Sequence, residues 1–442
     1  MTARKNPEPV WRSIEERSDA GKACRDQLKR VDQAAYKAPG KRKDLSERLL
    51  AAVKGRQEEL LPIRWGRMSQ SPFRFYRGTA ALMAADIGAA PVAGLETGLC
   101  GDAHLLNLGA YADPEGRLVF DLNDFDEACR GPFEWDLKRL ATSLVLAGRE
   151  SSHKEAECAV AVQAMAASWR ENMRRYAEMP ARSVAKVLVR AGDGRKPLAP
   201  VFAAAALDTP ASLVKKATEP DGKGFFHFIS KEPLTRRLEE KELALALAAL
   251  PEYVASLPPA RQQLMTRYTP MDGAQRVMGC GSVGVLNWII LFRGVSASDA
   301  LFLEFKAANP SCWRPSEAGH RGQAIVAAAQ QLQTWADPFL GWTTLKGQAC
   351  LVRQWSDHKA AIDPAMLTGP GLQSYAALCG MVLAKAQART GDPAMLAGYA
   401  GGSDKLDKAL ATFAKACADQ ATLDWETFKT EIAERRFPVL LA

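Results

Sequence analysis

Two short acidic motifs are the parts of this sequence best suited to chemistry: GDAHLLN at residues 101–107 and DLNDFD at residues 121–126. The side chains in them that could act are Asp102, His104, Asn107, Asp121, Asp124 and Asp126. An Asp with an Asn five residues later, followed after a strand by an Asp-Phe pair, can present a base and two metal ligands for phosphoryl transfer. We therefore expect Asp102 to orient or deprotonate an acceptor hydroxyl. Asn107 and Asp124 are the expected ligands of Mg²⁺, with Asp126 as a further metal or supporting group.

These residue types also have a plainer explanation, because Asp and Asn are common in turns and helix caps. That explanation does not account for three carboxylates in DLNDFD beside an apolar strand. His104 also has two possible roles, shaping the loop or binding a metal. The chain has five histidines and His104 has no HxH or HxxxH partner, so a loop-shaping role is favoured over metal ligation.

A glycine-rich segment, GCGSVG at residues 279–284, lies between two predicted strands. A dinucleotide-binding fold would require a helix after such a segment, whereas a kinase-type phosphate loop is a hairpin. Lys306 follows in the apolar run LFLEFKAAN, where a cation needs an anionic partner unless it reaches solvent. The residues expected to hold nucleotide phosphates are Gly279, Gly281, Ser282, Gly284 and Lys306.

In kinases this lysine pairs with a helix Glu, but the helix predicted over residues 322–335 has none. The candidate partners left open are Glu317, Gln323, Gln330 and Gln331, or no partner. Arg77 and Arg74, in SPFRFYRG, could bind phosphate or stack on the neighbouring aromatic rings. The segment VRQWSDHK at residues 352–359 is a candidate for reading adenine through backbone groups.

The remaining elements follow from periodicity. Strands are expected at residues 107–111 and 117–123, separated by the turn sequence ADPEG, and an amphipathic helix at 134–148. Residues 71–87 should be a turn and then a helix, 191–235 irregular with small elements, 236–250 a helix and 251–272 a connector with a short helix. Strands should follow at 275–309, then a helix at 322–335, two more strands and a helical region from 364. This order predicts an α+β fold. The expected divisions are 1–60, 61–190, 191–270, 271–358 and 359–442.

Composition narrows the protein class. The chain has 442 residues, of which 47% are apolar and 24% charged, as in soluble globular proteins. We find no apolar run long enough for a membrane span and no secretory signal, and the nine cysteines form no CxxC pair, so we expect the reducing cytoplasm. Residues 1–70 hold 17 Lys and Arg against 10 Asp and Glu. A solvated helical extension is favoured over nucleic-acid binding, because aromatic residues are sparse there.

The two acidic motifs, SPFRFYRG, VMGCGSVG and VRQWSDHK together resemble an uncharacterised bacterial family, domain of unknown function 2252. The segment from GDAHLLN to GPFEWDL also looks like the catalytic core of aminoglycoside and choline phosphotransferases. That resemblance implies a bilobal protein-kinase-like fold, ATP and Mg²⁺. It also implies that Asp102, Asn107 and Asp124 act as proposed above and that Asp136 braces the loop. The glycine-rich segment follows the acidic motifs instead of preceding them, so we expect a circular permutation.

Three rival functions remain open at this point. The first is a nucleotidyl transferase on the same scaffold, which would move AMP instead of phosphate. The second is a metal-dependent hydrolase that uses Asp102, His104, Asp121 and Asp124 without nucleotide. The third is a nucleotide-binding protein without turnover. The acceptor is not identified, because acceptor pockets are built from variable loops.

Overall fold

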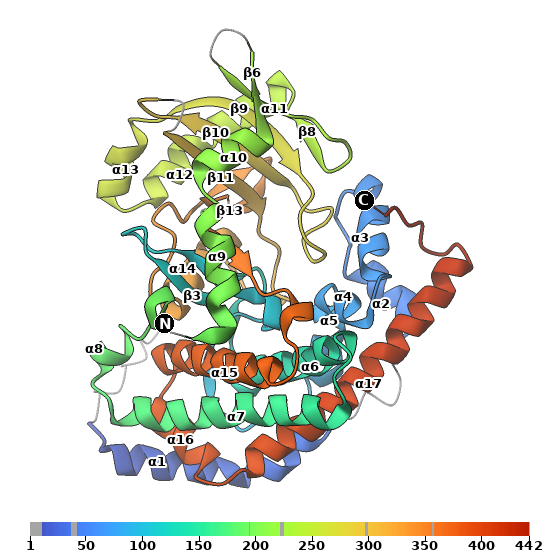
Figure 1. The fold of residues 1–442 in the computed structure, drawn as a ribbon, viewed down its shortest axis with the longest axis vertical. Helices are drawn as coiled ribbons and strands as arrows, with labels where there is room; N and C mark the ends of the chain where they lie inside the picture. The colour runs from blue at the N-terminus through green and yellow to red at the C-terminus, as the bar shows by residue number, and fades with distance from the viewer. Residues whose placement is uncertain are drawn as a thin grey trace, which may run out of the picture.

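The fold is α+β, as expected, with an antiparallel sheet in the upper part of Figure 1 and mostly helices in the lower part. It was analysed in a computed structural model that describes residues 11–36, 42–193, 195–221, 225–296, 299–355 and 358–441.

The upper sheet has six strands in the order β12-β13-β11-β10-β9-β8. Their bounds are Thr235–Arg237 (β8), Thr269–Arg276 (β9), Asn287–Arg293 (β10), Ala300–Ala307 (β11), Gly341–Leu345 (β12) and Gln348–Gln354 (β13). Four of these strands, β10 to β13, lie where the sequence predicts them. β9 begins inside the predicted connector, and no strand is predicted at β8. The sheet is buried on both faces, which explains the continuous apolar run in β10: Trp288, Ile290 and Phe292 face one side, and Ile289 and Leu291 the other.

Helices cover both faces of this sheet. One face packs on α11 (Glu240–Ala248), α12 (Leu250–Ser256) and α13 (Pro259–Met265), through Ala246, Tyr253 and Met265. The other face packs on α10 (Pro210–Ala217), preceded by α9 (Ala199–Leu207) and followed by the hairpin of β6 (Thr218–Pro220) and β7 (Phe226–Phe228). The small elements expected in residues 191–235 are present and include two helices. The predicted 236–250 helix begins only at Glu240, and the connector contains two short helices where one was expected, together with the start of β9. These short elements are stabilised by the sheet they cover and not by strong local periodicity.

A second sheet lies below the first, in the order β14-β2-β3-β5. Its strands are β2 (Leu108–Ala112), β3 (Leu118–Leu122), β5 (Val189–Arg190) and β14 (Ala360–Ala361). The predicted hairpin is confirmed as β2 and β3, which pair antiparallel from Leu108–Leu122 to Ala112–Leu118. A separate pair, β1 (Glu96–Leu99) and β4 (Cys129–Pro132), flanks the acidic motifs on either side. Both acidic motifs are thus held at the ends of short, paired strands.

The largest apolar core lies among the lower helices and the second sheet. These helices are α5 (Ala80–Ile87), α6 (Glu134–Glu150), α7 (Glu155–Glu178), α8 (Ala181–Val184), α14 (Arg321–Leu332), α15 (Gly371–Thr390), α16 (Pro393–Ala400) and α17 (Lys405–Ala433). The predicted helix at 134–148 is confirmed as α6, which is buried along nearly its whole length. Across the described residues, no single helix is both long and apolar enough to cross a membrane. Two helical segments joined by a bend, Lys196–Leu207 and Pro210–Ala217, would together have the length and composition of a membrane span.

The basic N-terminal segment is folded against the rest of the chain. It contains α1 (Ile14–Ala23), α2 (Leu45–Ala51), α3 (Leu61–Met68) and α4 (Pro72–Arg77). Arg42 forms ion pairs with Asp86 and Asp424, and Arg25 donates to the carbonyl of Tyr399 at 2.9 Å. The expected solvated extension is therefore wrong for the part of residues 1–60 that the structure describes, which leaves out 1–10 and 37–41. The expected turn before Thr79 is also wrong, since residues 72–77 form α4.

A buried ion pair inside the core offers a test of this packing. Lys385 on α15 pairs with Asp121 on β3, and both side chains are almost fully buried. We expect Lys385→Met to lower the free energy of unfolding by about 3–5 kcal/mol, because it leaves a buried carboxylate without its cation. Adding Asp121→Asn should restore most of the loss, as measured by urea denaturation followed by circular dichroism.

The matched control is Lys408→Met, which removes an exposed lysine paired with Asp404. It should leave the unfolding midpoint unchanged, because exposed ion pairs contribute little. If Lys385→Met behaved like Lys408→Met, the buried pair would not be a constraint on the fold.

Candidate functional site

A cavity of about 130 Å³ lies between the six-stranded sheet and the two acidic motifs. Its lining includes most of the predicted site residues: Arg77, Asp102, His104, Asn107, Asp124, Asp126, Gly279, Gly281, Ser282 and Lys306. These residues come from segments up to about two hundred positions apart in the chain. The proximity of Lys306 to Asp124 that the permuted order requires is therefore present in this fold.

Backbone bonds hold the first acidic motif in place. Gly101 has a φ of +77°, and a Cβ there would collide with the backbone of Glu127, so only glycine suits the position. Asp136 on α6 accepts the N–H groups of Cys100 at 2.9 Å and Gly101 at 3.0 Å. This is the bracing contact that the resemblance implies for Asp136. Burial raises the pKa of Asp136 to about 6.

Asp102 is held by a cation that the sequence did not indicate. Arg139, fully buried on α6, donates from Nε to Asp102 Oδ1 at 2.8 Å and from a terminal nitrogen to the carbonyl of Tyr76 at 2.7 Å. Its guanidinium carbon lies 3.8 Å from the centre of the Tyr76 ring. Burial raises the pKa of Asp102, while Arg139 works in the opposite direction. Asp102 therefore keeps one oxygen fixed and the other available to the cavity.

His104 lies beside Asp102 and is buried. Its Nε2 is 3.8 Å from Asp102 Oδ2, and its Nδ1 has no hydrogen-bond partner among the described residues. Burial lowers the pKa of His104, and Arg77 and Arg139 lower it further, so the ring is neutral at pH 7. Nowhere in the described part of the chain do three or more His, Cys, Asp or Glu side chains form a group that could hold a metal.

Lys306 on β11 forms an ion pair with Asp126 across the cavity. Burial alone would lower the pKa of Lys306, but the charges of Asp126 and Asp124 outweigh burial and raise it. The partner of Lys306 thus comes from the second acidic motif and not from α14. Glu317, one of the expected partners, lies 3.6 Å from Arg321 instead.

The cavity has oxygen atoms suited to Mg²⁺. Asn107 donates its amide N–H to the carbonyl of Asp102 at 2.8 Å, which leaves its side-chain oxygen free. Burial and then the charge of Asp126 raise the pKa of Asp124, whereas the charge of Lys306 acts in the opposite direction. One amide and one or two carboxylate oxygens, completed by water and phosphate, match the ligands that Mg²⁺ takes in nucleotide enzymes.

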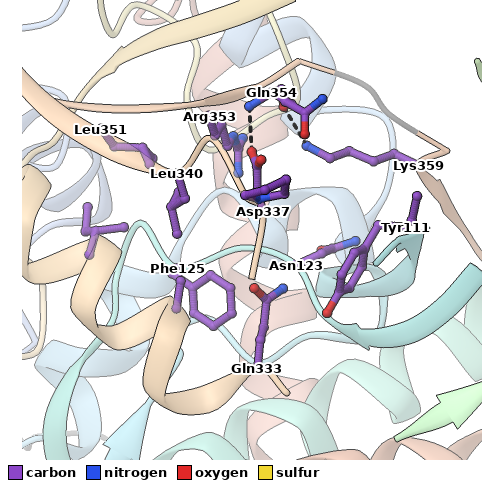
Figure 2. A pocket seen from close by; sticks show the side chains of 14 residues that line it. Tyr111, Asn123, Phe125, Gln333, Asp337, Leu340, Leu351, Arg353, Gln354 and Lys359 are labelled. Atoms are coloured by element: carbon purple, nitrogen blue, oxygen red, sulfur yellow. Dashed lines mark hydrogen bonds between the residues drawn. The ribbon is translucent and has the colours of Figure 1, made fainter. Parts of the chain in front are cut away.

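A narrower slot of about 60 Å³ adjoins the cavity (Figure 2). Leu340, Leu351 and Phe125 lie on one side of the slot, and Tyr111 lies on the other. Ile325 on α14 lines both the slot and the cavity. The slot thus has a mainly apolar lining and shares Ile325 with the charged cavity.

The segment 123–126 lies between the slot and the cavity and leads into a turn in which the Ala128 N–H donates to the Phe125 carbonyl. Asn123 and Phe125 line the slot, whereas Asp124 and Asp126 line the cavity. One short segment therefore serves both spaces. The apolar residue between the two aspartates of NDFD, Phe125, is thus explained by its place in the lining of the slot.

The end of β13 forms one rim of the slot. The Gln354 N–H donates to Asp337 Oδ2 at 2.6 Å, and the Gln354 carbonyl accepts from Lys359 Nζ at 3.0 Å (Figure 2). Three residues of the predicted adenine-reading segment, Arg353, Gln354 and Lys359, line the slot. Residues 356 and 357 of that segment fall outside the described residues.

Three predicted residues do not line the cavity. Asp136 acts through the backbone of the loop, and Gly284 is bonded through its carbonyl to the N–H of Gln57 at 2.8 Å. Asp121 points into the core, where it pairs with Lys385. The hydrolase set that included Asp121 is therefore not brought together.

Sequence reasoning missed several residues around the cavity. Arg56 and Glu127 line it, and Trp313 donates from its indole nitrogen to the carbonyl of Gly101 at 2.6 Å. Arg139 carried one usable signal: it lies three positions after Asp136, and so on the same face of a helix. The others come from distant segments and carry no local pattern.

The bracing of the loop gives a testable prediction. Asp136→Ala should leave the N–H groups of Cys100 and Gly101 without an acceptor, at a cost of about 1–3 kcal/mol. Hydrogen–deuterium exchange should then rise in residues 99–107. Asp113→Ala is the matched control, because Asp113 also accepts two backbone N–H groups, from Glu115 and Arg117, in the β2–β3 turn. It should leave exchange in 99–107 unchanged, and an equal rise in both variants would contradict the bracing role.

Comparison with known proteins places the chain in a family. No curated protein and no solved structure matches it. The family described as an uncharacterized protein conserved in bacteria (DUF2252) matches residues 56–431. That match covers both acidic motifs, the glycine-rich segment, Lys306 and the slot, so the protein is a member of this bacterial family.

Proposed function

We propose that this protein is an ATP- and Mg²⁺-dependent phosphotransferase that acts on a hydroxyl group of a still unidentified acceptor. The observation that carries the proposal is the junction of the apolar slot with the charged cavity across residues 123–126. A nucleotide has the same division into a flat base and a charged phosphate chain. Two neighbouring spaces of this kind fit a nucleotide better than they fit a small polar metabolite.

Cations in the cavity match the phosphate chain. Lys306, Arg56 and Arg77 line it together with the glycine-rich loop. The Nε of Arg77 is buried and has no partner among the described residues. A buried donor of this kind is costly to leave unpaired, and a phosphate oxygen would satisfy it.

Asp102 is proposed to receive the acceptor hydroxyl. Arg139 fixes one of its oxygens, so the carboxylate keeps a single orientation in which the other oxygen can accept the hydroxyl proton. Asn107 and Asp124 would hold the metal, which when bound neutralises phosphate charge. Lys306, released from Asp126 by an incoming phosphate, would contact that phosphate directly.

The order of elements in the sheet favours a kinase-like arrangement. The glycine-rich loop joins β9 to β10, Lys306 lies on the next strand, and α14 precedes the last two strands. Protein kinases carry a glycine-rich loop and a lysine on the third strand in this way. The acidic motifs come earlier in the chain, so a circularly permuted kinase-like fold is part of the proposal. The nine free cysteines and the need for ATP favour a cytoplasmic location.

The first test is binding. ATP with Mg²⁺ at one hundred times its Kd should stabilise the wild-type protein by about 2.7 kcal/mol, seen as a rise in Tm. Asp124→Ala should lose this Mg²⁺-dependent rise, whereas Asp113→Ala, away from the cavity, should keep it. No rise in the wild type would contradict the proposal.

Labelled ATP then distinguishes the reactions. Incubation with a bacterial metabolite extract should move label from the γ position to an acceptor, and Asp102→Asn should reduce that transfer by about a hundredfold or more. Transfer from the α position would instead establish the nucleotidyl transferase alternative. Binding without transfer of either label would favour a protein without turnover.

The rate should also depend on pH in a defined way. Burial raises the pKa of both Asp102 and Asp124 above the ordinary 3.8, and both must be ionised to act. Activity is therefore present above these raised values and is lost as pH falls through them, so the acid limb of kcat/KM lies above pH 3.8. Arg139→Gln should move this limb to higher pH, because Arg139 lowers the pKa of Asp102. If the acid limb of kcat/KM stayed at the same pH in Arg139→Gln and Tm was unchanged, Asp102 would not be the titrating group.

A further inference from the structure

The carbonyls of the glycine-rich loop are held by three arginines, Arg56, Arg64 and Arg67, which we call the arginine clasp. Arg56 also lines the cavity, whereas Arg64 and Arg67 are not among its lining residues. Arg56 donates to the carbonyls of Gly281 at 2.5 Å and Val283 at 2.8 Å. Arg64 donates to the carbonyls of Cys280 and Gly281, and Arg67 donates to that of Gly279 at 2.5 Å. Every loop carbonyl from Gly279 to Gly281 thus accepts a charged donor.

The clasp is anchored to the lower part of the molecule. Figure 1 shows α3, which carries Arg64 and Arg67, beside the C-terminal end of the described chain. Trp65 of α3 packs on Phe428 and Phe437. On its other side, Leu60 and Ile63 form a small apolar cluster with Val277 and Val283, which flank the glycines. The arginines are therefore attached to a rigid support.

Fixing the carbonyls also fixes the N–H groups. In a trans peptide the C=O and the following N–H point in opposite directions. The carbonyls of Gly279, Cys280 and Gly281 point toward the clasp, so the N–H groups of Cys280, Gly281 and Ser282 point away from it. Those three N–H groups have no acceptor among the described residues, and these residues line the cavity. Successive N–H groups turned the same way form an anion-binding surface.

The positive charge of the clasp also favours an anion at the glycine-rich loop. Arg64 is fully buried and all of its acceptors are carbonyls, including Gly78 at 2.6 Å. Burial and the nearby Arg56 lower the pKa of Arg64 to about 9, as expected for a cation without a carboxylate partner. An anion on the far side of the loop would stabilise this charge.

We propose that Arg56, Arg64 and Arg67 are positioning residues that turn the glycine-rich loop into a binding site for a polyphosphate chain, by holding its carbonyls away from the cavity. The inference rests on the proposed function for the identity of the ligand. It adds that the nucleotide affinity depends on a segment that contacts the loop from outside the sheet.

The experiment compares Arg56→Met and Arg67→Met with Arg74→Met, an exposed arginine on the neighbouring helix α4. Arg64 is left in place because its loss would also release Gly78 and damage the fold. Isothermal titration calorimetry measures binding of ATP with Mg²⁺, of inorganic tripolyphosphate and of adenosine. We expect the clasp variants to bind ATP and tripolyphosphate at least tenfold more weakly and adenosine unchanged. Hydrogen exchange in residues 279–284 should rise, Arg67→Lys should recover part of the affinity, and Arg74→Met should match the wild type.

Each outcome decides between the two proposals. Unchanged ATP and tripolyphosphate affinity in both clasp variants would overturn the clasp and leave the phosphotransferase proposal intact. Binding of tripolyphosphate that depends on the clasp, without any binding of ATP, would support the clasp and overturn the proposed function. A wild-type protein that binds neither probe would overturn both.

Discussion

Mutual repulsion among partly buried carboxylates is the constraint on which this architecture depends. Asp102, Asp124, Asp126 and Glu127 line one cavity, and like charges grouped in this way need nearby cations to stay ionised. The cations come from separate parts of the fold: Lys306 from the upper sheet and Arg139 from a helix of the lower core. Separating the two parts would leave Lys306 and Asp126 without each other, so this ion pair helps to fix how the sheet lies over the acidic motifs.

The sequence was informative wherever the determining contacts are local. The turn ADPEG between two alternating segments specified the β2–β3 hairpin, and the apolar period of 134–148 specified α6. The same holds for the site. Asp102 and Asn107 share one short loop, and Asp124 follows a buried strand, so their grouping could be predicted from spacing alone. Membership of a bacterial family and the α+β class were likewise within reach.

What could not be predicted depends on contacts between distant residues. The partner of Lys306 lies 180 positions away on the acidic motif, where a helix residue was expected. Runs of charged residues are usually solvated, so the sequence predicts a solvated extension for the basic N-terminal segment. Its arginines instead bind carbonyls and aspartates across the fold, and carbonyl acceptors have no sequence signature. Asp121 was included in the site for its type and position, and only the location of Lys385 explains why it turns into the core.

The alternation along residues 123–126 restricts how this protein can change over evolution. Single substitutions at Asn123 or Phe125 alter one space and leave the other intact, so the shape of the slot can vary independently of the charged side chains. Inserting or deleting one residue there is different, because it would shift which side chains line each space. The length of this segment and the identity of its two aspartates therefore both have to be preserved.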